Sequence, residues 1–269
     1  MKIVFRSLVP AALLAVVALL GGCAADAASE DTAASAEDLS SARLSGYYEL
    51  AANADGDTWI EQLALHDDGA FEANMGNDVS NLSGHHYQTT GTFSVTQHGG
   101  TSVLTLHAVG EFAGSSSYDV VVQGAGGGLS VKDHGVTGAH AFAMKKTKLV
   151  TITFNADWTI TQSGPIVANA PFLVRYAASR DDCAAPAGGG LWLAAFGRFD
   201  NGVVTTITQP FGTRAVNGYL ASFGSVPALG SDLAVWFRGS AVTAQGTLTS
   251  CTHWDSNLAK NYHFAVAAN

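Results

Sequence analysis

Apolar and polar residues alternate with a period of two from about residue 44 onward. Gly, Asn or Asp interrupts the alternation about every eight to twelve residues, which is typical of antiparallel strands joined by hairpins. Tight turns are expected at Asp68-Gly69 and Gly99-Gly100, because Gly tolerates a positive φ. In this first part of the chain the pattern predicts strands at residues 46–51, 59–66, 70–74, 91–97, 102–109, 117–123, 128–132 and 141–145.

A second unit is expected from about Thr147, where Lys145-Lys146-Thr147-Lys148 interrupts the pattern. Alternation in Phe172, Val174 and Tyr176, and again in Trp192, Ala194 and Phe196, predicts that these residues enter the core of a two-sheet sandwich. Trp158, Trp192 and Trp236 are expected to be core aromatics. The strands of this unit are predicted at residues 149–154, 172–177, 191–199, 203–208, 232–238, 247–254 and 262–266.

Short segments recur along the first unit: Gly46 to Leu50, Leu63-Ala64-Leu65, Asp68-Gly69-Ala70-Phe71, Gly91 to Val95 and Leu104-Thr105-Leu106. In their spacing the unit resembles the small lipocalin-like β-barrel domains of bacterial lipoproteins. The fold class is therefore expected to be all-β, with a small antiparallel lipocalin-like barrel over residues 44–146 and an antiparallel β-sandwich over residues 147–269.

The N-terminus has the organisation of a secretory signal. Lys2 and Arg6 precede an apolar run, residues 8–20, which is too short to span a bilayer of ~30 Å comfortably. Leu20-Gly21-Gly22-Cys23 then resembles a bacterial lipobox. That resemblance implies removal of residues 1–22, acylation of Cys23 by chains such as palmitate, and an extracytoplasmic protein anchored to the membrane. Because Ala24 rather than Asp follows the Cys, it also implies the outer membrane where the cell has one. The alternative is an ordinary cleaved signal with a chance Cys.

The segment after Cys23 is polar, and residues 24–41 are almost wholly Ala, Asp, Glu, Ser and Thr. Such a segment has too little apolar surface to offset its ordering entropy, so residues 23–43 are expected to form a disordered tether. The chain has 13 Lys+Arg and 22 Asp+Glu, and without Lys2 and Arg6 the mature balance is 11 minus 22, or −11. This charge argues against a nucleic-acid partner.

Three cysteines are present, and Cys23 is assigned to lipid. Cys183 and Cys251 remain as an even pair in a compartment where disulfides persist, which predicts a bond between them. Two separate buried thiols or a pair of metal ligands are the alternatives.

The end of the chain contains the residues with the most specific pattern. Three segments of the second unit carry a resemblance: Ile152 to Trp158, Val174 to Cys183 and Cys251 to Phe264. They resemble a family of uncharacterised bacterial secreted proteins. The last hairpin contains Trp254-Asp255-Ser256-Asn257 and Asn261-Tyr262. In these residues it is separately similar to starch- and glycogen-binding modules, although Ser256 and Ala259 depart from the usual Asn and Gly.

A sugar site needs a flat aromatic face and polar groups that match ring hydroxyls. The hairpin supplies both, so its candidate ligand-binding residues are Trp254, Asp255, Asn257, Asn261 and Tyr262. In the alternative interpretation the hairpin is purely structural: Asp255 and Asn257 are turn residues, while Trp254 and Tyr262 pack across strands.

The sequence contains no nucleophile elbow, zinc-protease helix, phosphate loop or dinucleotide fingerprint. Seven of the nine His lie before residue 147, including His85-His86, but without spacing typical of metal ligands. We therefore expect no cofactor, no metal and no catalysis. The leading hypothesis is a non-catalytic, ligand-binding lipoprotein of the cell envelope whose C-terminal domain recognises glycans. The alternative is a structural or protein-interaction lipoprotein, inhibitor-like and without a small ligand, whose partner is an envelope protein.

Overall fold

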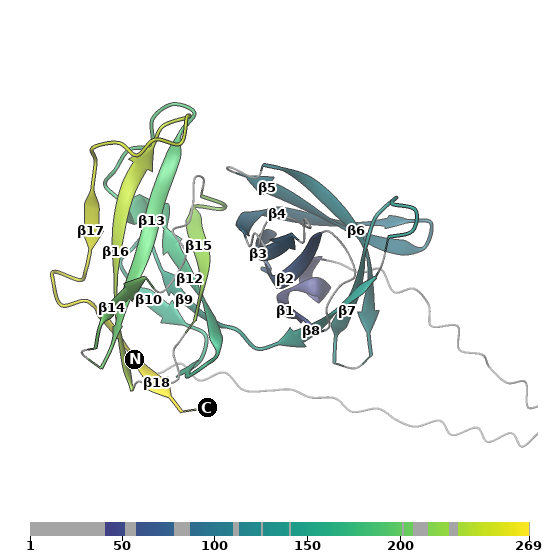
Figure 1. Cartoon of the computed structure of the whole chain (residues 1–269), viewed down its shortest axis with the longest axis horizontal. Helices are drawn as coiled ribbons and strands as arrows, with labels where there is room; N and C mark the ends of the chain where they lie inside the picture. Colours follow the sequence, from purple (N-terminus) through teal and green to yellow (C-terminus); the bar gives the residue numbers. More distant parts are fainter. Residues whose placement is uncertain are drawn as a thin grey trace, which may run out of the picture. The chain divides into compact units, whose positions relative to one another are not determined.

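The computed structural model describes residues 41–51, 58–77, 87–109, 113–124, 126–139, 141–200, 202–206, 215–225 and 231–268. Their regular structure is nearly all β (Figure 1), with one short α-helix, α1 (Ser41–Leu44), and one turn of 3-10 helix, η2 (Ala178–Arg180). Residues 38–269 form one compact unit. Within the described ranges, no helix has the length and apolarity needed to cross a membrane. The predicted signal peptide, Cys23 and nearly all of the tether lie outside these ranges.

The first eight strands form a closed antiparallel barrel, in which β8 pairs with β1 (Figure 1). The expectation of an all-β chain that begins with an antiparallel barrel is thus confirmed. The strands are β1 (Gly46–Leu50), β2 (Thr58–Leu65), β3 (Ala70–Asn77), β4 (Tyr87–His98), β5 (Thr101–Val109), β6 (Gly114–Gln123), β7 (Gly128–Asp133) and β8 (Phe142–Thr147).

Both predicted tight turns lie between barrel strands. Gly69, with φ of 79°, joins β2 to β3, and Asp68 stabilises that turn by accepting a hydrogen bond from the Ala70 N–H at 3.0 Å. Gly99 and Gly100, with φ of 57° and 81°, join β4 to β5. These left-handed conformations explain why Gly occupies the turns.

The described residues after β8 form two further sheets. One has the strand order β10-β9-β12-β15, and the other has the order β11-β18-β16-β13-β14 with β17 added beside β16. The strands are β9 (Val150–Phe154), β10 (Ile160–Gln162), β11 (Ile166–Val167), β12 (Pro171–Ala177), β13 (Gly190–Phe199), β14 (Val204–Thr206), β15 (Tyr219–Ser225), β16 (Asp232–Val242), β17 (His253–Asp255) and β18 (Tyr262–Ala267).

Pairing in this region is mixed, so the expectation of purely antiparallel sheets was wrong. β12 runs parallel to β9, and β11 runs parallel to β18. The reason is a crossover that the sequence pattern did not reveal: after β9 the chain forms β10, pairs in the second sheet as β11, and only then returns to the first sheet as β12.

One hydrophobic cluster contains residues of both sheets. Phe154 of β9 and Tyr176 of β12 share it with Phe237 of β16, whose ring centroid lies 4.6 Å from each of the other two. Phe172, Val174 and Tyr176 belong to this cluster, as predicted.

The inward face of β13 was predicted incorrectly. Leu193 and Ala195 enter the core cluster, whereas Trp192 and Phe196 are only partly buried and lie on the opposite face of the strand. Trp236 shares that outer face with Phe196, its cross-strand partner. A shift of one residue along a strand reverses which side chains face the core. Because β13 and β16 carry bulky residues on both faces, periodicity alone assigned the wrong residues of β13 to the core.

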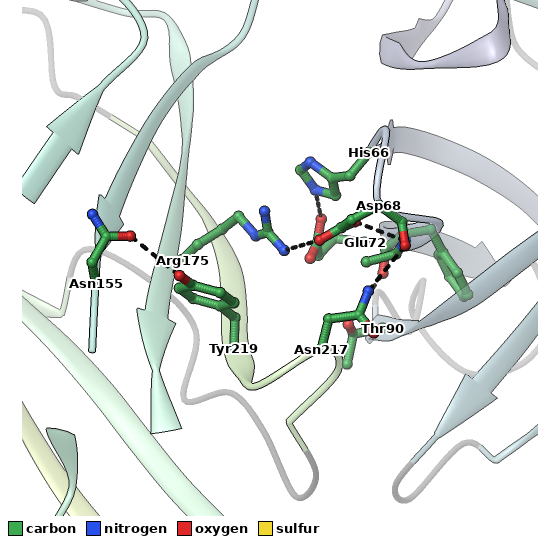
Figure 2. Close-up of polar contacts among 10 residues, drawn as sticks. His66, Asp68, Glu72, Thr90, Asn155, Arg175, Asn217 and Tyr219 are labelled. Carbon is green, nitrogen blue, oxygen red and sulfur yellow. Dashed lines mark hydrogen bonds and ion pairs between the residues drawn. The ribbon is translucent and has the colours of Figure 1, made fainter. Parts of the chain in front are cut away.

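The outer face of the four-stranded sheet is covered by barrel residues. Leu173 of β12 and Phe223 of β15 form a second buried cluster with Tyr47 and Ala64 of the barrel. Beside it, Arg175 Nη2 donates to Asp68 Oδ2 at 3.2 Å, as Figure 2 shows. This sheet therefore has apolar residues on both faces.

Asp68 also accepts a hydrogen bond through its backbone carbonyl oxygen. The Asn217 side chain donates from Nδ2 to the Asp68 carbonyl oxygen at 3.1 Å (Figure 2). Arg175 in turn lies over the Tyr219 ring, with its guanidinium carbon 4.8 Å from the ring centroid. Asp68 thus joins the β2–β3 hairpin to both β12 and the segment before β15.

We predict that alkaline pH weakens the barrel through Tyr48. Its hydroxyl is buried and donates to the Leu44 carbonyl oxygen at 2.7 Å, and burial raises its pKa to about 12. An unfolded Tyr ionises near pH ~10, so the stabilisation is complete below that pH and is lost as pH rises toward 12. Urea unfolding at several pH values should show this loss.

Tyr48→Phe should reduce the fall in unfolding free energy between pH 10 and 12 by up to roughly 2 kcal/mol. Tyr219→Phe, which changes a phenol outside the barrel, serves as the comparison. An equally steep fall in Tyr48→Phe and wild type would contradict the assignment.

Candidate functional site

The five predicted ligand-binding residues lie on β17, β18 and the turn that joins them. Asn257 and Asn261 are turn residues with φ of 49° and 57°. The Asn257 side chain donates from Nδ2 to the Asn261 carbonyl oxygen at 3.2 Å, and the Asn261 N–H donates to the Ser256 carbonyl oxygen at 2.7 Å. The two asparagines therefore have a local structural role in holding the turn.

Asp255 and Tyr262 face inward and belong to a buried polar network. Asp255 is 3% exposed and forms an ion pair with Arg180, whose Nη2 lies 2.9 Å from Oδ2. Tyr176 donates to the same oxygen at 3.0 Å, while the Tyr262 hydroxyl donates to Oδ1. Arg180 Nη2 also donates to the Tyr262 hydroxyl at 2.5 Å. Each carboxylate oxygen of Asp255 is thus satisfied within the fold.

Aromatic rings surround Arg180, which is 1% exposed. Its guanidinium carbon lies 4.6 Å from the Trp158 ring centroid and between 5.3 and 5.4 Å from the centroids of Phe154, Tyr176 and Tyr262. Nε and Nη1 have no hydrogen-bond partner, and cation–π attraction offsets part of the cost of their desolvation.

Trp158 was predicted to be a core residue, and this was wrong. Its side chain is 59% exposed and covers the guanidinium of Arg180 from the solvent side. Its backbone has a φ of 68°, in the turn that follows β9. A residue held in this turn cannot continue the strand alternation from which its burial was inferred.

Burial raises the pKa of both tyrosines in the network, and the negative charge of Asp255 raises each pKa further. Both phenols therefore stay protonated over the physiological range and remain hydrogen-bond donors to Asp255. Deprotonation would place a second negative charge against the carboxylate. The network is stable only with one carboxylate, one guanidinium and two neutral phenols.

The predicted disulfide is present between Cys183 and Cys251, with the Cα atoms 5.8 Å apart. Cys183 follows η2, which contains Arg180, and Cys251 precedes β17, which contains Asp255. The bond therefore ties together the two chain segments that supply the buried ion pair.

Trp254 points the other way from Asp255, because successive residues of a strand face opposite sides. It is 54% exposed, and its ring centroid lies 6.0 Å from that of Phe196. Phe196 stacks in turn on Trp236, with centroids 6.1 Å apart and planes inclined by 17°. We call these three residues the aromatic face. They lie on the outer surface of the six-stranded sheet, on β17, β13 and β16.

Two arginines lie next to the aromatic face on the same side of the sheet. Arg238 is paired with Trp254 across the strands, and its guanidinium carbon is 5.7 Å from the Trp254 ring centroid. Arg198 lies two residues beyond Phe196 on β13. The Nε atoms of both arginines are buried without a hydrogen-bond partner, and neither guanidinium pairs with a carboxylate of the described residues. Cationic donors thus flank flat rings in an acidic protein.

Residues 52–267 match a family of unknown function, DUF6209. The chain belongs to this family. The match spans both the barrel and the two sheets, so DUF6209 comprises both regions of this chain. Neither the curated proteins nor the solved structures contain a significant match.

Membership of DUF6209 confirms the expected resemblance to an uncharacterised family in its coarser form. The lipobox, the lipocalin-like barrel and the similarity to starch-binding modules stay predictions. So does ligand binding by the hairpin, of which the structure exposes Trp254 and buries Asp255 and Tyr262.

The histidines of this DUF6209 chain do not gather into a metal site in the described ranges, where no three His, Cys, Asp or Glu residues converge. Four of them pair singly with carboxylates: His66 with Glu72, His134 with Asp119, His253 with Asp182 and His263 with Asp232. His85, His86 and His140 lie outside the described residues.

Sequence reasoning selected Trp254 but missed Phe196, Trp236, Arg198 and Arg238 as its neighbours. The sequence contained a signal for these neighbours. Residues 192, 196 and 198 of β13 and residues 236 and 238 of β16 have even numbers and are aromatic or Arg. Residues of one parity share one face of a strand. An outer face rich in Trp, Phe and Arg could have been inferred by assigning the odd-numbered residues, which are apolar or Gly, to the core.

Loss of the Asp255 charge should strongly destabilise the fold. We expect Asp255→Asn to lower the free energy of unfolding by about 3 to 5 kcal/mol, because it leaves the Arg180 charge buried without a counterion. Urea denaturation with the disulfide intact measures this change. Asp182→Asn is the matched control, since its carboxylate is 83% exposed beside His253 and should contribute less than about 1 kcal/mol. Equal effects of the two substitutions would contradict the role assigned to the network.

Proposed function

We propose that this protein is a non-catalytic binding protein of the cell envelope, whose C-terminal region is a β-sandwich that binds a glycan on the aromatic face. One observation carries the proposal: exposed Trp254 forms a continuous ring surface with Phe196 and Trp236, flanked by two arginines without carboxylate partners. Faces of aromatic rings stack on the C–H faces of sugars, and guanidinium groups donate to sugar oxygens.

The shared hydrophobic cluster supports the sandwich, because residues from both sheets meet in it. The barrel residues cover the outer face of the four-stranded sheet, whereas they form no such cluster with the aromatic face in the described residues. An apolar patch that retains polar neighbours is typical of a surface used for binding. A sheet face suits an extended ligand such as a polysaccharide chain.

The binding surface differs from the one expected from the hairpin alone. The side chains of Asp255 and Tyr262 are bonded to Arg180, and the Asn257 side chain holds the turn, so these three side chains already have partners within the fold. Trp254 is the residue that the two interpretations share. In the proposed site its polar partners are Arg198 and Arg238 instead of the hairpin carboxylate and amides.

Trp254→Ala should reduce glycan binding at least tenfold, since a Trp at the centre of a binding surface commonly contributes more than ~1.4 kcal/mol. A glycan array identifies the ligand, and retention on insoluble glucan and peptidoglycan measures the change. Leu258→Ala is the matched control, because Leu258 is 94% exposed in the same hairpin. Both variants should retain the wild-type far-UV CD spectrum.

The proposal would be wrong if wild-type protein binds no glycan, or if Trp254→Ala binds as well as Leu258→Ala does. Specific pull-down of an envelope protein without any glycan signal would instead support the structural or protein-interaction alternative.

The proposed placement in the envelope depends on Cys23. We expect Cys23→Ser to shift the protein from the membrane fraction to the soluble extracytoplasmic fraction, because the acyl chains would be lost. An immunoblot of fractionated cells and metabolic labelling with palmitate test this, with Ala24→Ser as the control that keeps the cysteine. Retention of Cys23→Ser in the membrane fraction would contradict the lipid anchor.

A further inference from the structure

The two arginines of the outer sheet surface stand at opposite ends of the aromatic face. Arg238 of β16 is paired across the strands with Ala194 of β13, and Arg198 of β13 is paired with Ala234 of β16. The stacked rings of β13 and β16 lie between these two positions. Four residues separate the positions along the strands, which corresponds to roughly 13 Å at about 3.3 Å per residue. The two positive charges are therefore spaced along a row of rings.

The terminal nitrogens of both guanidinium groups remain open to a ligand. Both side chains are partly exposed, and only Nε of each is buried without a partner. Nη1 and Nη2 form no ion pair with the described residues. A guanidinium that lies over a ring, as Arg238 lies over Trp254, still presents N–H groups at its edge. Each arginine can thus donate to a ligand that rests on the rings.

The acidic groups near the end of β13 have other partners. Asp232 lies on the outer face of β16, and its Oδ2 is 2.8 Å from Nδ1 of His263. Asp200 follows β13 and accepts hydrogen bonds from the Ser231 and Asp232 N–H groups, each at 2.8 Å. Neither carboxylate neutralises Arg198 or Arg238, although the chain has 22 Asp+Glu and only 13 Lys+Arg. An anionic ligand would supply the missing counterions.

We propose that the aromatic face recognises a carboxylated glycan, a polysaccharide built from uronic acids. This inference rests on the proposed glycan binding and specifies its ligand class. A uronic acid combines a pyranose ring with a carboxylate, so its ring stacks on Trp254 while its carboxylate accepts two hydrogen bonds from the fork of Arg238. A carboxylate further along the same chain reaches Arg198. An acidic peptide offers the charge without the sugar ring.

Oligogalacturonate and its methyl ester are matched probes, because they share the same rings and only the acid is charged. Calorimetric titration of the purified full chain at neutral pH and about 0.05 M salt should show the acid binding about tenfold more tightly than the ester. Raising the salt to about 0.5 M should remove most of this difference, since exposed charges are screened. Polyglutamate has carboxylates without sugar rings and should bind more weakly than the acid.

Variants of the two arginines test the assignment of the charge. Arg238→Gln and Arg198→Gln should each reduce the preference for the acid over the ester about fivefold, because the positive charge is lost. Arg238→Lys keeps the charge without the fork and should show an intermediate preference. Lys145→Gln is the matched control, since it removes one exposed positive charge from the barrel and should leave the preference unchanged.

The outcomes separate this inference from the proposed function. Equal binding of acid and ester by the wild type would overturn the inference and leave glycan binding in place, provided that Trp254→Ala weakens both. If neither probe binds, the inference is wrong, and the glycan array decides whether the proposed function fails with it. The inference also fails if polyglutamate binds as well as the acid, or if Lys145→Gln lowers the preference as much as Arg238→Gln does.

Discussion

The buried ion pair between Arg180 and Asp255 is the constraint on which the C-terminal region depends. Two charges can remain in a core only if each is paired and hydrogen-bonded, and here two phenols complete the set. The participants come from η2, β12, β17 and β18, so the pair joins the two sheets at one point. Strand alternation then has a further effect. With Asp255 fixed inward, Trp254 must face outward, beside Phe196. The need to pair Arg180 with Asp255 in the core thereby determines on which face of the sheet Trp254 is exposed.

The two sheets differ in what their outer faces contact. Leu173 and Phe223 on the four-stranded sheet are buried against the barrel residues Tyr47 and Ala64, which accounts for their hydrophobicity. The aromatic face of the six-stranded sheet has no such structural partner in the described part of the chain. Burial by the barrel explains the first apolar surface, and ligand binding is our explanation for the second. DUF6209 spans both regions, which is consistent with their close contact.

Local patterns predicted the strands and turns of the barrel well, because hairpins depend on neighbouring residues. Asp68-Gly69 is an example, since the turn is determined by the backbone freedom of Gly and a local carboxylate contact. The expectation that Cys23 carries lipid left Cys183 and Cys251 as an even pair, and the predicted bond between them is present. Prediction failed where the outcome depends on distant residues. The ion partner of Asp255 lies 75 positions earlier in the chain, and no periodicity relates the two. The parallel pairing of β9 with β12 likewise requires the crossover through β11.

The disulfide turns the backbone between Cys183 and Cys251 into a covalently closed loop of the chain. A protease that cuts once anywhere in this loop produces two polypeptides that the bond still holds together. Phe196 and Trp236 lie inside the loop and Trp254 lies just after it, so all three would remain on one molecule after such a cut. In a compartment that contains proteases and lacks cytosolic reductants, the disulfide would therefore keep the three residues of the aromatic face covalently linked after a single cut in this loop.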